Sequence, residues 1–250
     1  NNKEYSSILL SNGKKIKASL VVAADSRFSR TRSEMGISAF VHDFKKNMIV
    51  CRMKHEKPHG NIAHEFFRYE KTQASLPYIN KQSSIITTAT KNETLSLMKI
   101  NQKKFNKEMQ NNFNNSLGKM KLKGKRYSYP MITTYSKKFV THRFALIGDA
   151  AVGMHPVTAH GFNLSLKGLE ILINEIRSAI KNKIDIGLPN TLLRYQFKFH
   201  KTAMPLYLGT NGIVSLYSNS IFPVKILRHL ALRLTNIIKP VKQVFLQALK

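Results

Sequence analysis

The sequence is poor in cysteine and in long apolar runs, and each shortage excludes a class of protein. Cys51 is the only cysteine among the 250 residues, so no disulfide can form within the chain, which suits a reducing cytoplasm. No stretch reaches the roughly 18 consecutive apolar residues that a transmembrane helix needs, and no secretory leader opens the sequence. We therefore expect a cytoplasmic protein that is soluble or peripheral to a membrane.

Acidic residues are also scarce. Only 13 Asp and Glu stand against 41 Lys and Arg, which gives a formal net charge of +28. Such a charge attracts an acidic lipid surface, nucleic acid or a phosphorylated cofactor, but lysines spread over solvated faces explain it equally well. With 42% hydrophobic and 22% charged residues, the chain has the composition of a folded protein rather than a disordered one.

The beginning of the sequence combines a hairpin, a buried strand and a short helix. The pair Asn12 and Gly13 between two short runs predicts a type I′ turn. Residues 20–24 form an apolar run too short for a helix, which indicates a strand buried on both faces, as in a parallel sheet. Residues 29–35 predict a short helix that Gly36 closes.

The middle of the sequence is richer in β-branched and aromatic residues, which favours strands. We expect an antiparallel sheet built from residues 48–53, 62–69, 84–90 and 94–98. Apolar residues then recur at helical spacing over 99–117, which predicts an amphipathic helix. Residues 118–125 follow as a basic loop that carries two glycines.

The last part of the sequence returns to an α/β pattern. A second buried strand is predicted over 144–147, and a loop at 148–151 joins it to a long helix over 162–181. Further helices are expected over 189–202, 204–217 and 222–238.

Both predicted buried strands end at an aspartate, Asp25 and Asp149. Ligands of α/β sheets bind at the carboxyl ends of the strands, where loops and helix N-termini converge. A carboxylate at that edge can accept hydrogen bonds from a sugar, and helix N–H groups suit anionic oxygens. Taken singly, either aspartate is explained as well by a capping role in a tight turn.

The longer strings around these aspartates resemble a known family. ALIGDAAVGMHPVTAHGFNLSLKGLE (residues 145–170) is similar to the flavin-contacting motif of the p-hydroxybenzoate-hydroxylase-like class. VVAADSRFSRTR (residues 21–32) resembles the second fingerprint of that class, except that Ser26 stands where the class has glycine and serine disfavours positive φ. The residues of the first string are most similar to those of FAD-dependent hydroxylases of ubiquinone biosynthesis, in a broad-specificity branch that includes demethoxyubiquinol hydroxylation.

This resemblance implies an α/β fold with a p-hydroxybenzoate-hydroxylase-like FAD domain, an antiparallel β-sheet substrate domain and a C-terminal helical segment. The partial FAD domain would comprise residues 1–37 and 131–185, with its aspartate motif and long helix in the second part. The β-rich substrate domain would span 38–130, and basic C-terminal helices would span 186–250.

The resemblance also implies roles for individual residues toward FAD. Asp149 would hydrogen-bond the ribityl chain, and Pro156 would stand near the reacting face of the isoalloxazine. Gly161, Phe162 and Asn163 would offer backbone groups to the pyrimidine edge, and the helix N-terminus after them would stabilise negative charge on the reduced ring.

Further cofactor-binding residues follow from the same two fingerprints. Asp25 and Arg32 would lie around the pyrophosphate and the region where the nicotinamide cofactor donates hydride. Gly148 and Ala150 flank Asp149 in the flavin-contacting motif and complete the cofactor-binding set.

His155 and His160 flank Pro156 in the same loop. They are candidates for substrate-side hydrogen bonding or acid–base work, although simple loop packing also explains them. No carboxylate or cysteine accompanies them at ligand spacing, so we expect no metal.

In the family that the sequence resembles, NAD(P)H reduces FAD, O2 forms a flavin C4a-hydroperoxide, and the ring of an aromatic quinone precursor attacks its distal oxygen. The resemblance thus implies FAD and NAD(P)H as cofactors, and a homo-oligomer or a ubiquinone-biosynthesis complex as the assembly. Alternatives are a hydroxylase or reductase of the same class on another substrate, an inactive fragment, or a basic nucleic-acid-binding scaffold. We expect no nucleic-acid partner, because no RNA- or DNA-binding motif is present.

The family requires a Gly-x-Gly-x-x-Gly turn for the ADP pyrophosphate, and the 12 glycines of this chain contain no such spacing. We expect that segment to precede Asn1, so that the chain as given is incomplete and binds FAD poorly.

The end of the sequence is basic and amphipathic. No acidic residue follows Asp185, and residues 221–250 mix apolar side chains with lysine and arginine. Such a segment suits adsorption to an anionic membrane surface, here the inner membrane that holds the quinone, although a helix packed on the protein with solvated lysines explains it too.

Overall fold

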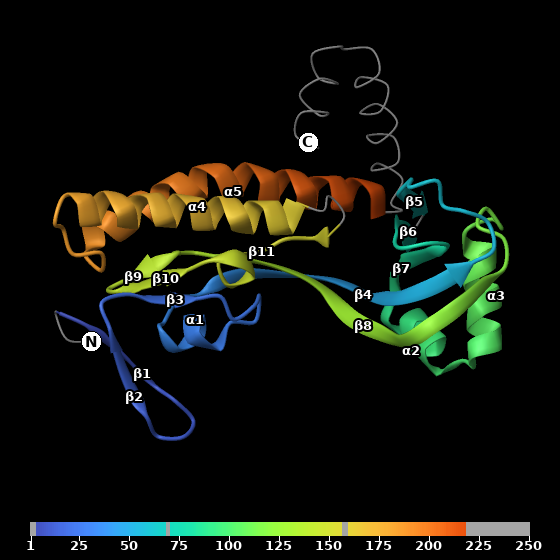
Figure 1. Cartoon of the computed structure of the whole chain (residues 1–250), viewed down its shortest axis with the longest axis horizontal. Helices are drawn as coiled ribbons and strands as arrows, with labels where there is room; N and C mark the ends of the chain where they lie inside the picture. The colour runs from blue at the N-terminus through green and yellow to red at the C-terminus, as the bar shows by residue number, and fades with distance from the viewer. Residues whose placement is uncertain (1–3, 69–70, 157–159, 219–250) are drawn as a thin grey trace, which may run out of the picture. The chain divides into compact units, whose positions relative to one another are not determined.

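The computed structural model describes residues 4–68, 71–156 and 160–218 (Figure 1). The chain divides into two compact units. Within the described residues, unit 1 comprises 4–42 and 132–212, and unit 2 comprises 43–131 and 213–218.

Unit 1 begins with a hairpin of β1 (Ser6–Leu9) and β2 (Lys15–Ala18), which pair antiparallel. The connection is closed by a bond of 2.9 Å from the Leu10 N–H to the Lys14 carbonyl oxygen. Gly13 has a φ of 80°, but Asn12 is not among the residues with positive φ. The expected type I′ turn is therefore wrong, because this longer connection needs only one left-handed residue.

The central sheet of unit 1 joins the two predicted buried strands. β3 (Val21–Ala23) pairs in parallel with β10 (Phe144–Leu146), and β9 (Val140–Thr141) pairs antiparallel on the other side of β10. β10 is buried along its whole length, as predicted, whereas Val22 of β3 is exposed. Since the strands are parallel, their carboxyl ends lie at the same edge.

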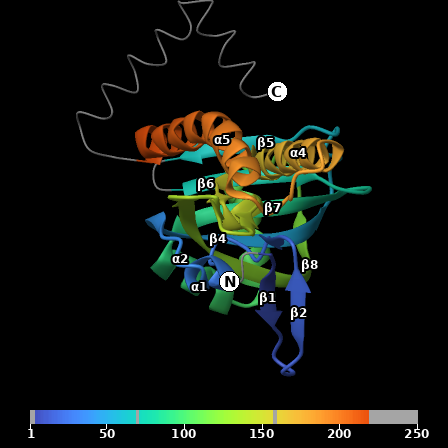
Figure 2. The ribbon, with the colours of Figure 1, turned by 90° about the vertical axis from the view of Figure 1, so that its left-hand side faces the viewer.

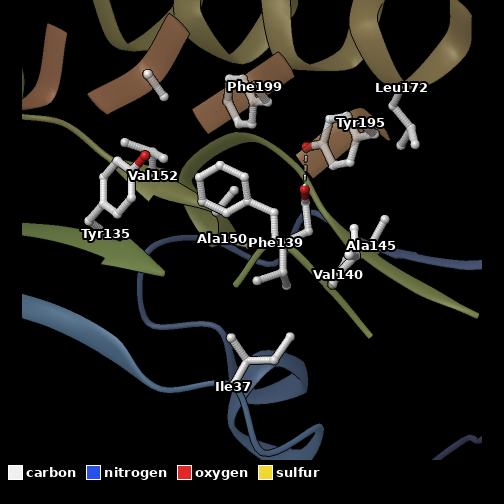
Figure 3. Packing of buried hydrophobic residues seen from close by; sticks show 14 of the residues in the cluster. Ile37, Tyr135, Phe139, Val140, Ala145, Ala150, Val152, Leu172, Tyr195 and Phe199 are labelled. Atoms are coloured by element: carbon white, nitrogen blue, oxygen red, sulfur yellow. Dashed lines mark hydrogen bonds between the residues drawn. The ribbon is translucent and has the colours of Figure 1, made fainter. Parts of the chain in front are cut away.

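Helices cover both faces of this sheet. α4 (His160–Lys181) and α5 (Pro189–Ser218) lie on one face, and the short α1 (Arg30–Glu34) lies on the other (Figures 1 and 2). Tyr195 of α5 donates a hydrogen bond of 2.6 Å to the carbonyl oxygen of Leu146, and both are buried (Figure 3). This bond satisfies a polar hydroxyl inside an otherwise apolar core.

α5 corrects one expectation. Separate helices were predicted over 189–202 and 204–217, but the helix runs continuously through Pro205. Proline removes one backbone hydrogen bond, yet Ala203 and Tyr207 on either side of it are both buried in the core of unit 1, and this packing holds the helix together. The predicted helix over 222–238 lies outside the described residues.

Unit 2 contains the expected antiparallel sheet. β4 (Ala39–His55), β7 (Gln82–Thr90), β6 (Lys71–Pro77) and β5 (His64–Arg68) are neighbours in that order. β8 (Met120–Ser136) lies on the other side of β4, and β11 (Val152–Gly153) pairs with its end. The strands β4 and β8 each continue into unit 1.

One face of the sheet of unit 2 is covered by a helix at the predicted place. α3 (Gln102–Asn112) buries Phe105 and Met109, which form one apolar cluster with Ile49, Cys51 and Met53 of β4. Burial raises the pKa of the Cys51 thiol to about 12, so this cysteine is a core residue that stays protonated.

Two expectations in unit 2 are wrong. Residues 94–98 belong to α2 (Lys91–Lys99) rather than to a strand, because Thr90 and Glu93 form a reciprocal capping box that starts a helix. The predicted basic loop over 118–125 is mostly the start of β8, where buried Met120 and Leu122 alternate with exposed lysines. The strand continues because its apolar face packs into the core under α3.

Candidate functional site

The first element of the site is the turn between β3 and α1, which Asp25 organises. Its Oδ1 accepts a hydrogen bond from Ser29 Oγ at 2.5 Å, and its Oδ2 accepts from the N–H and Oγ1 of Thr31 at 3.1 and 2.8 Å. Burial alone would raise the pKa of this carboxyl group, but the hydrogen bonds outweigh burial and hold the pKa below its ordinary value. Asp25 is therefore an ionised and fixed side chain at the edge of the sheet.

The backbone of this turn is left-handed at Ser26, whose φ is 79°. The family that the sequence resembles has glycine at this position. The turn keeps the glycine-like conformation with a serine, at a steric cost that glycine would not carry.

The second element is the loop after β10, where Gly148–Ala150 form a single 3-10 turn called η1. Gly148 has a φ of 59°, which favours glycine, and Asp149 follows it. The Asp149 carboxylate accepts two hydrogen bonds from Arg27, from Nε at 3.2 Å and from Nη2 at 2.7 Å. Both side chains are partly exposed, at 27% for Arg27 and 35% for Asp149.

A second arginine joins the two loops from the buried side. Arg32 of α1 donates a hydrogen bond of 3.1 Å from Nη1 to the carbonyl oxygen of Ala150, which also accepts from Ser136 Oγ at 3.0 Å. Burial lowers the pKa of the Arg32 guanidinium, and the charge of Asp25 acts in the opposite direction. The two fingerprints, more than 100 residues apart in sequence, are thus held together by two guanidinium groups.

The third element is the segment from Gly153 into α4. His155 is buried, and Pro156 beside it is exposed. α4 opens at His160, and its first turn presents Gly161, the exposed ring of Phe162 and exposed Asn163. The first N–H groups of a helix have no partner inside the helix, so this turn can bind an anionic or carbonyl oxygen.

The residues of this edge fit the ribityl and ring portions of FAD. Asp149 offers a partly exposed carboxylate, and the first turn of α4 offers N–H groups. The fit does not extend to the ADP pyrophosphate, because no Gly-x-Gly-x-x-Gly turn occurs in the chain.

Sequence reasoning missed Arg27 and Gly153 as parts of the site. A β-carbon on Gly153 would stand 2.7 Å from Thr134 Oγ1 and 2.8 Å from the Cβ of Arg27, so only glycine fits there. No signal in a single sequence pairs Arg27 with Asp149, since 122 residues separate them.

Two other kinds of feature are absent from the described part of the chain. No group of three or more His, Cys, Asp and Glu side chains is arranged there to hold a metal ion. None of the helices there combines the length and the hydropathy required to cross a bilayer.

Comparison with known proteins gives relatives in sequence and in structure. Ubiquinone hydroxylase UbiM of Neisseria meningitidis is 40% identical over 242 residues, which are 97% of this chain and 52% of that protein. Ubiquinone hydroxylase UbiL of Rhodospirillum rubrum is 32% identical over 241 residues, 96% of this chain and 56% of that protein. The chain thus spans about half the length of the curated relatives it matches.

A solved structure, the OxyS anhydrotetracycline hydroxylase from Streptomyces rimosus, superposes with a TM-score of 0.74 at 15% identity. The match covers 100% of this chain and 50% of that one, which confirms the expected fold class. Residues 4–201 match the family described as FAD binding domain. On this match over most of its length, the chain belongs to the FAD binding domain family.

Proposed function

We propose that the protein containing this chain is an FAD-dependent monooxygenase that hydroxylates the aromatic ring of a ubiquinone precursor with NAD(P)H and O2. The observation that carries the proposal is the 40% identity to ubiquinone hydroxylase UbiM across 97% of the chain. The paired aspartate loops at one sheet edge support it, because they are the part of the fold that a flavin would contact.

In this proposal Asp149 accepts a hydrogen bond from the ribityl chain, within the loop that Gly148 and Ala150 form. Gly161, Phe162 and Asn163 then present their backbone to the pyrimidine edge of the ring. When bound, FAD supplies the redox chemistry, since it takes a hydride from NAD(P)H and delivers activated oxygen to the substrate.

The remaining candidates act around the ring and the phosphates. Asp25 and Arg32 hold the turn near the pyrophosphate and the nicotinamide, and the hydrogen bonds of both side chains support a rigid turn there. Pro156 contributes an apolar contact at the ring face, which excludes water. His155 and His160 flank Pro156 and are the groups that would hold or move a proton on the substrate side.

The cellular setting belongs to the same proposal. Since a polyprenylated quinone resides in a bilayer, we propose a cytoplasmic enzyme that reaches the inner membrane through the basic segment 221–250, which lies outside the described residues. Co-sedimentation with anionic liposomes, with and without 221–250, tests this route, and equal binding by both chains contradicts it. A homo-oligomer or a ubiquinone-biosynthesis complex is tested by the mass of the protein in solution.

The activity is tested with the complete gene product and, in parallel, with the 250-residue chain alone. We expect the complete protein to purify with the absorbance of oxidised flavin. In a bacterium that lacks its own quinone hydroxylases, we expect it to restore hydroxylated quinones, measured by mass spectrometry. A colourless protein that binds no added FAD would overturn the proposal, and a flavoprotein that leaves quinone precursors unchanged would redirect it to another substrate.

Asp149→Ala is the sharpest variant for the proposed site. We expect loss of bound flavin, because the ribityl chain loses a charged hydrogen-bond acceptor, at a cost of about 1.5–3 kcal/mol. Asp43→Ala is the matched control, since Asp43 is a carboxylate of unit 2 that pairs with surface lysines. Normal flavin content in Asp149→Ala would contradict the assignment of this residue.

A further inference from the structure

Arg27 contacts Asp149 in an asymmetric way. Its Nε and Nη2 both donate to Oδ2 of Asp149, at 3.2 and 2.7 Å. Oδ1 of Asp149 accepts no hydrogen bond from the described residues, and the side chain remains 35% exposed. One carboxylate oxygen is therefore fixed by the protein, and the other is left for a ligand.

Arg27 is itself held in place on two further sides. Its Nη1 donates a hydrogen bond of 2.8 Å to the carbonyl oxygen of Ile132. Its Cβ lies so close to Gly153 that a β-carbon there would stand 2.8 Å away. Because the carbonyl oxygen of Ile132 holds Nη1 and the backbone of Gly153 lies against Cβ, the guanidinium group of Arg27 has little freedom to leave Asp149.

Arg27 does more than neutralise the charge of Asp149, because its hydrogen bonds also fix the orientation of the carboxylate. A carboxylate on a short side chain rotates easily about its last torsion, which is broad and roughly two-fold. Two charge-assisted hydrogen bonds to one oxygen select one orientation of the group, and they leave the second oxygen as a strong acceptor. A hydroxyl donor that approaches from the exposed side then meets a preorganised acceptor.

We infer that Arg27 is a positioning residue that orients the Asp149 carboxylate, so that Oδ1 receives a hydroxyl group of the ribityl chain of the flavin. The inference rests on the proposed function, because it takes the bound ligand to be FAD. It gives a role to Arg27, a residue of the second fingerprint string to which the resemblance assigns none, and ties that role to one atom of the ligand-binding carboxylate.

Three variants of the complete gene product test the inference. Arg27→Met keeps the bulk of the side chain and removes the guanidinium group. Arg27→Lys keeps the positive charge but lacks the planar guanidinium that can donate two hydrogen bonds to one carboxylate. Arg30→Met is the matched control, because Arg30 lies three residues further on, is exposed and, among the residues that the structure describes, pairs only with Glu34. Dissociation constants are measured by flavin fluorescence with two probes, FAD and lumiflavin, which has the same ring but no ribityl chain.

We expect Arg27→Met to weaken FAD binding by about tenfold or more, as for loss of a charged hydrogen bond. Arg27→Lys should fall between this variant and the unmodified protein, and Arg30→Met should match the unmodified protein. Lumiflavin should bind all of them within about twofold, because only the ribityl chain reaches Asp149 in this proposal. A role that merely stabilises the fold would weaken both probes alike.

A double variant completes the design. In the Asp149→Ala background, adding Arg27→Met should cause no further loss of FAD affinity, since Arg27 acts through Asp149. Unchanged FAD binding by Arg27→Met, equal losses for FAD and lumiflavin, or an additive double variant would each overturn the inference. If the unmodified protein binds no FAD, the proposed function itself fails, and that outcome is distinct from the other three.

Discussion

The aromatic ring of Phe199 on α5 lies directly against the backbone of Gly168 on α4. A β-carbon on Gly168 would stand 2.7 Å from Cζ and 2.8 Å from Cε2 of that ring. Phe199 is fully buried and stacks on Tyr195 at 5.7 Å between centroids. The close approach of the two helices therefore depends on the absence of a side chain at position 168.

Gly168→Ala should destabilise the protein by about 1–3 kcal/mol, as expected for overpacking a buried contact. Gly209→Ala in α5 is the matched control, since a β-carbon there meets nothing within 4 Å. The control should gain up to about 1 kcal/mol from the higher helix propensity of alanine. Urea unfolding of both variants checks the pair, and shifts of the same sign would contradict the packing argument.

Ser26→Gly should stabilise the turn between β3 and α1. The φ of 79° at Ser26 costs an L-residue about 1–2 kcal/mol, and glycine removes this cost. Part of the gain is offset because glycine raises the conformational entropy of the unfolded chain. The expected net gain is about 0.5–1 kcal/mol in thermal unfolding. Ser26→Val should lose stability, because a β-branched residue tolerates this region least; a valine variant as stable as the glycine variant would refute the reasoning.

Glu175 should make the free energy of unfolding depend on pH in the acid range. This buried carboxylate of α4 bonds Arg194 at 2.7 Å and Lys198 at 2.6 Å, both on α5. Burial raises the pKa of Glu175, but the bonds from Lys198 and Arg194 outweigh it, so the folded pKa lies below the ordinary value of 4.5. The stabilisation is thus present above about pH 4.5 and is lost as pH falls through the folded pKa.

Glu175→Gln should therefore cost about 2 kcal/mol near neutral pH, less than for a fully buried pair because both cations are half-exposed. The difference from the unmodified protein should shrink below about pH 4.5. Unfolding by urea at several pH values measures it, with Glu170→Gln as the control, since Glu170 forms an exposed pair with Lys167. A constant difference at all pH values would show that the charge of Glu175 is not the cause.

His200 should give a second pH dependence, at higher pH. Its Nδ1 lies 2.8 Å from the Tyr135 hydroxyl, and its ring stacks on Phe139 at 4.1 Å between centroids. Burial lowers the pKa of His200 below its ordinary value of 6.5. The unfolded chain therefore binds the proton more readily, and stability falls as pH drops below about 6.5.

His200→Gln should flatten this fall in stability between about pH 7 and pH 5, because no imidazole remains to be protonated. The variant keeps a polar group for Tyr135, whose hydroxyl stays protonated since burial raises its pKa to about 12. Thermal unfolding across that pH range checks the expectation. An unaltered slope would assign the pH dependence to another histidine.

The local patterns of the sequence were sufficient for several elements. The apolar run before Asp25 and the one before Asp149 became the parallel strands β3 and β10, because such short continuous runs fit a buried strand. The helical spacing of buried Phe105 and Met109 placed α3 correctly. The start of α2 was also present in the sequence, as the capping pair Thr90 and Glu93, but β-branched residues nearby favoured a strand.

What the sequence determined alone is therefore the family and the identity of its two aspartate loops, since motif spacing and hydrophobic periodicity are properties of neighbouring residues. Only the tertiary structure decided that Arg27 binds Asp149, that Arg32 reaches Ala150 and that Phe199 needs glycine at 168. Each of these contacts joins residues far apart along the chain, and their energies depend on distances of a few ångströms that no local pattern encodes.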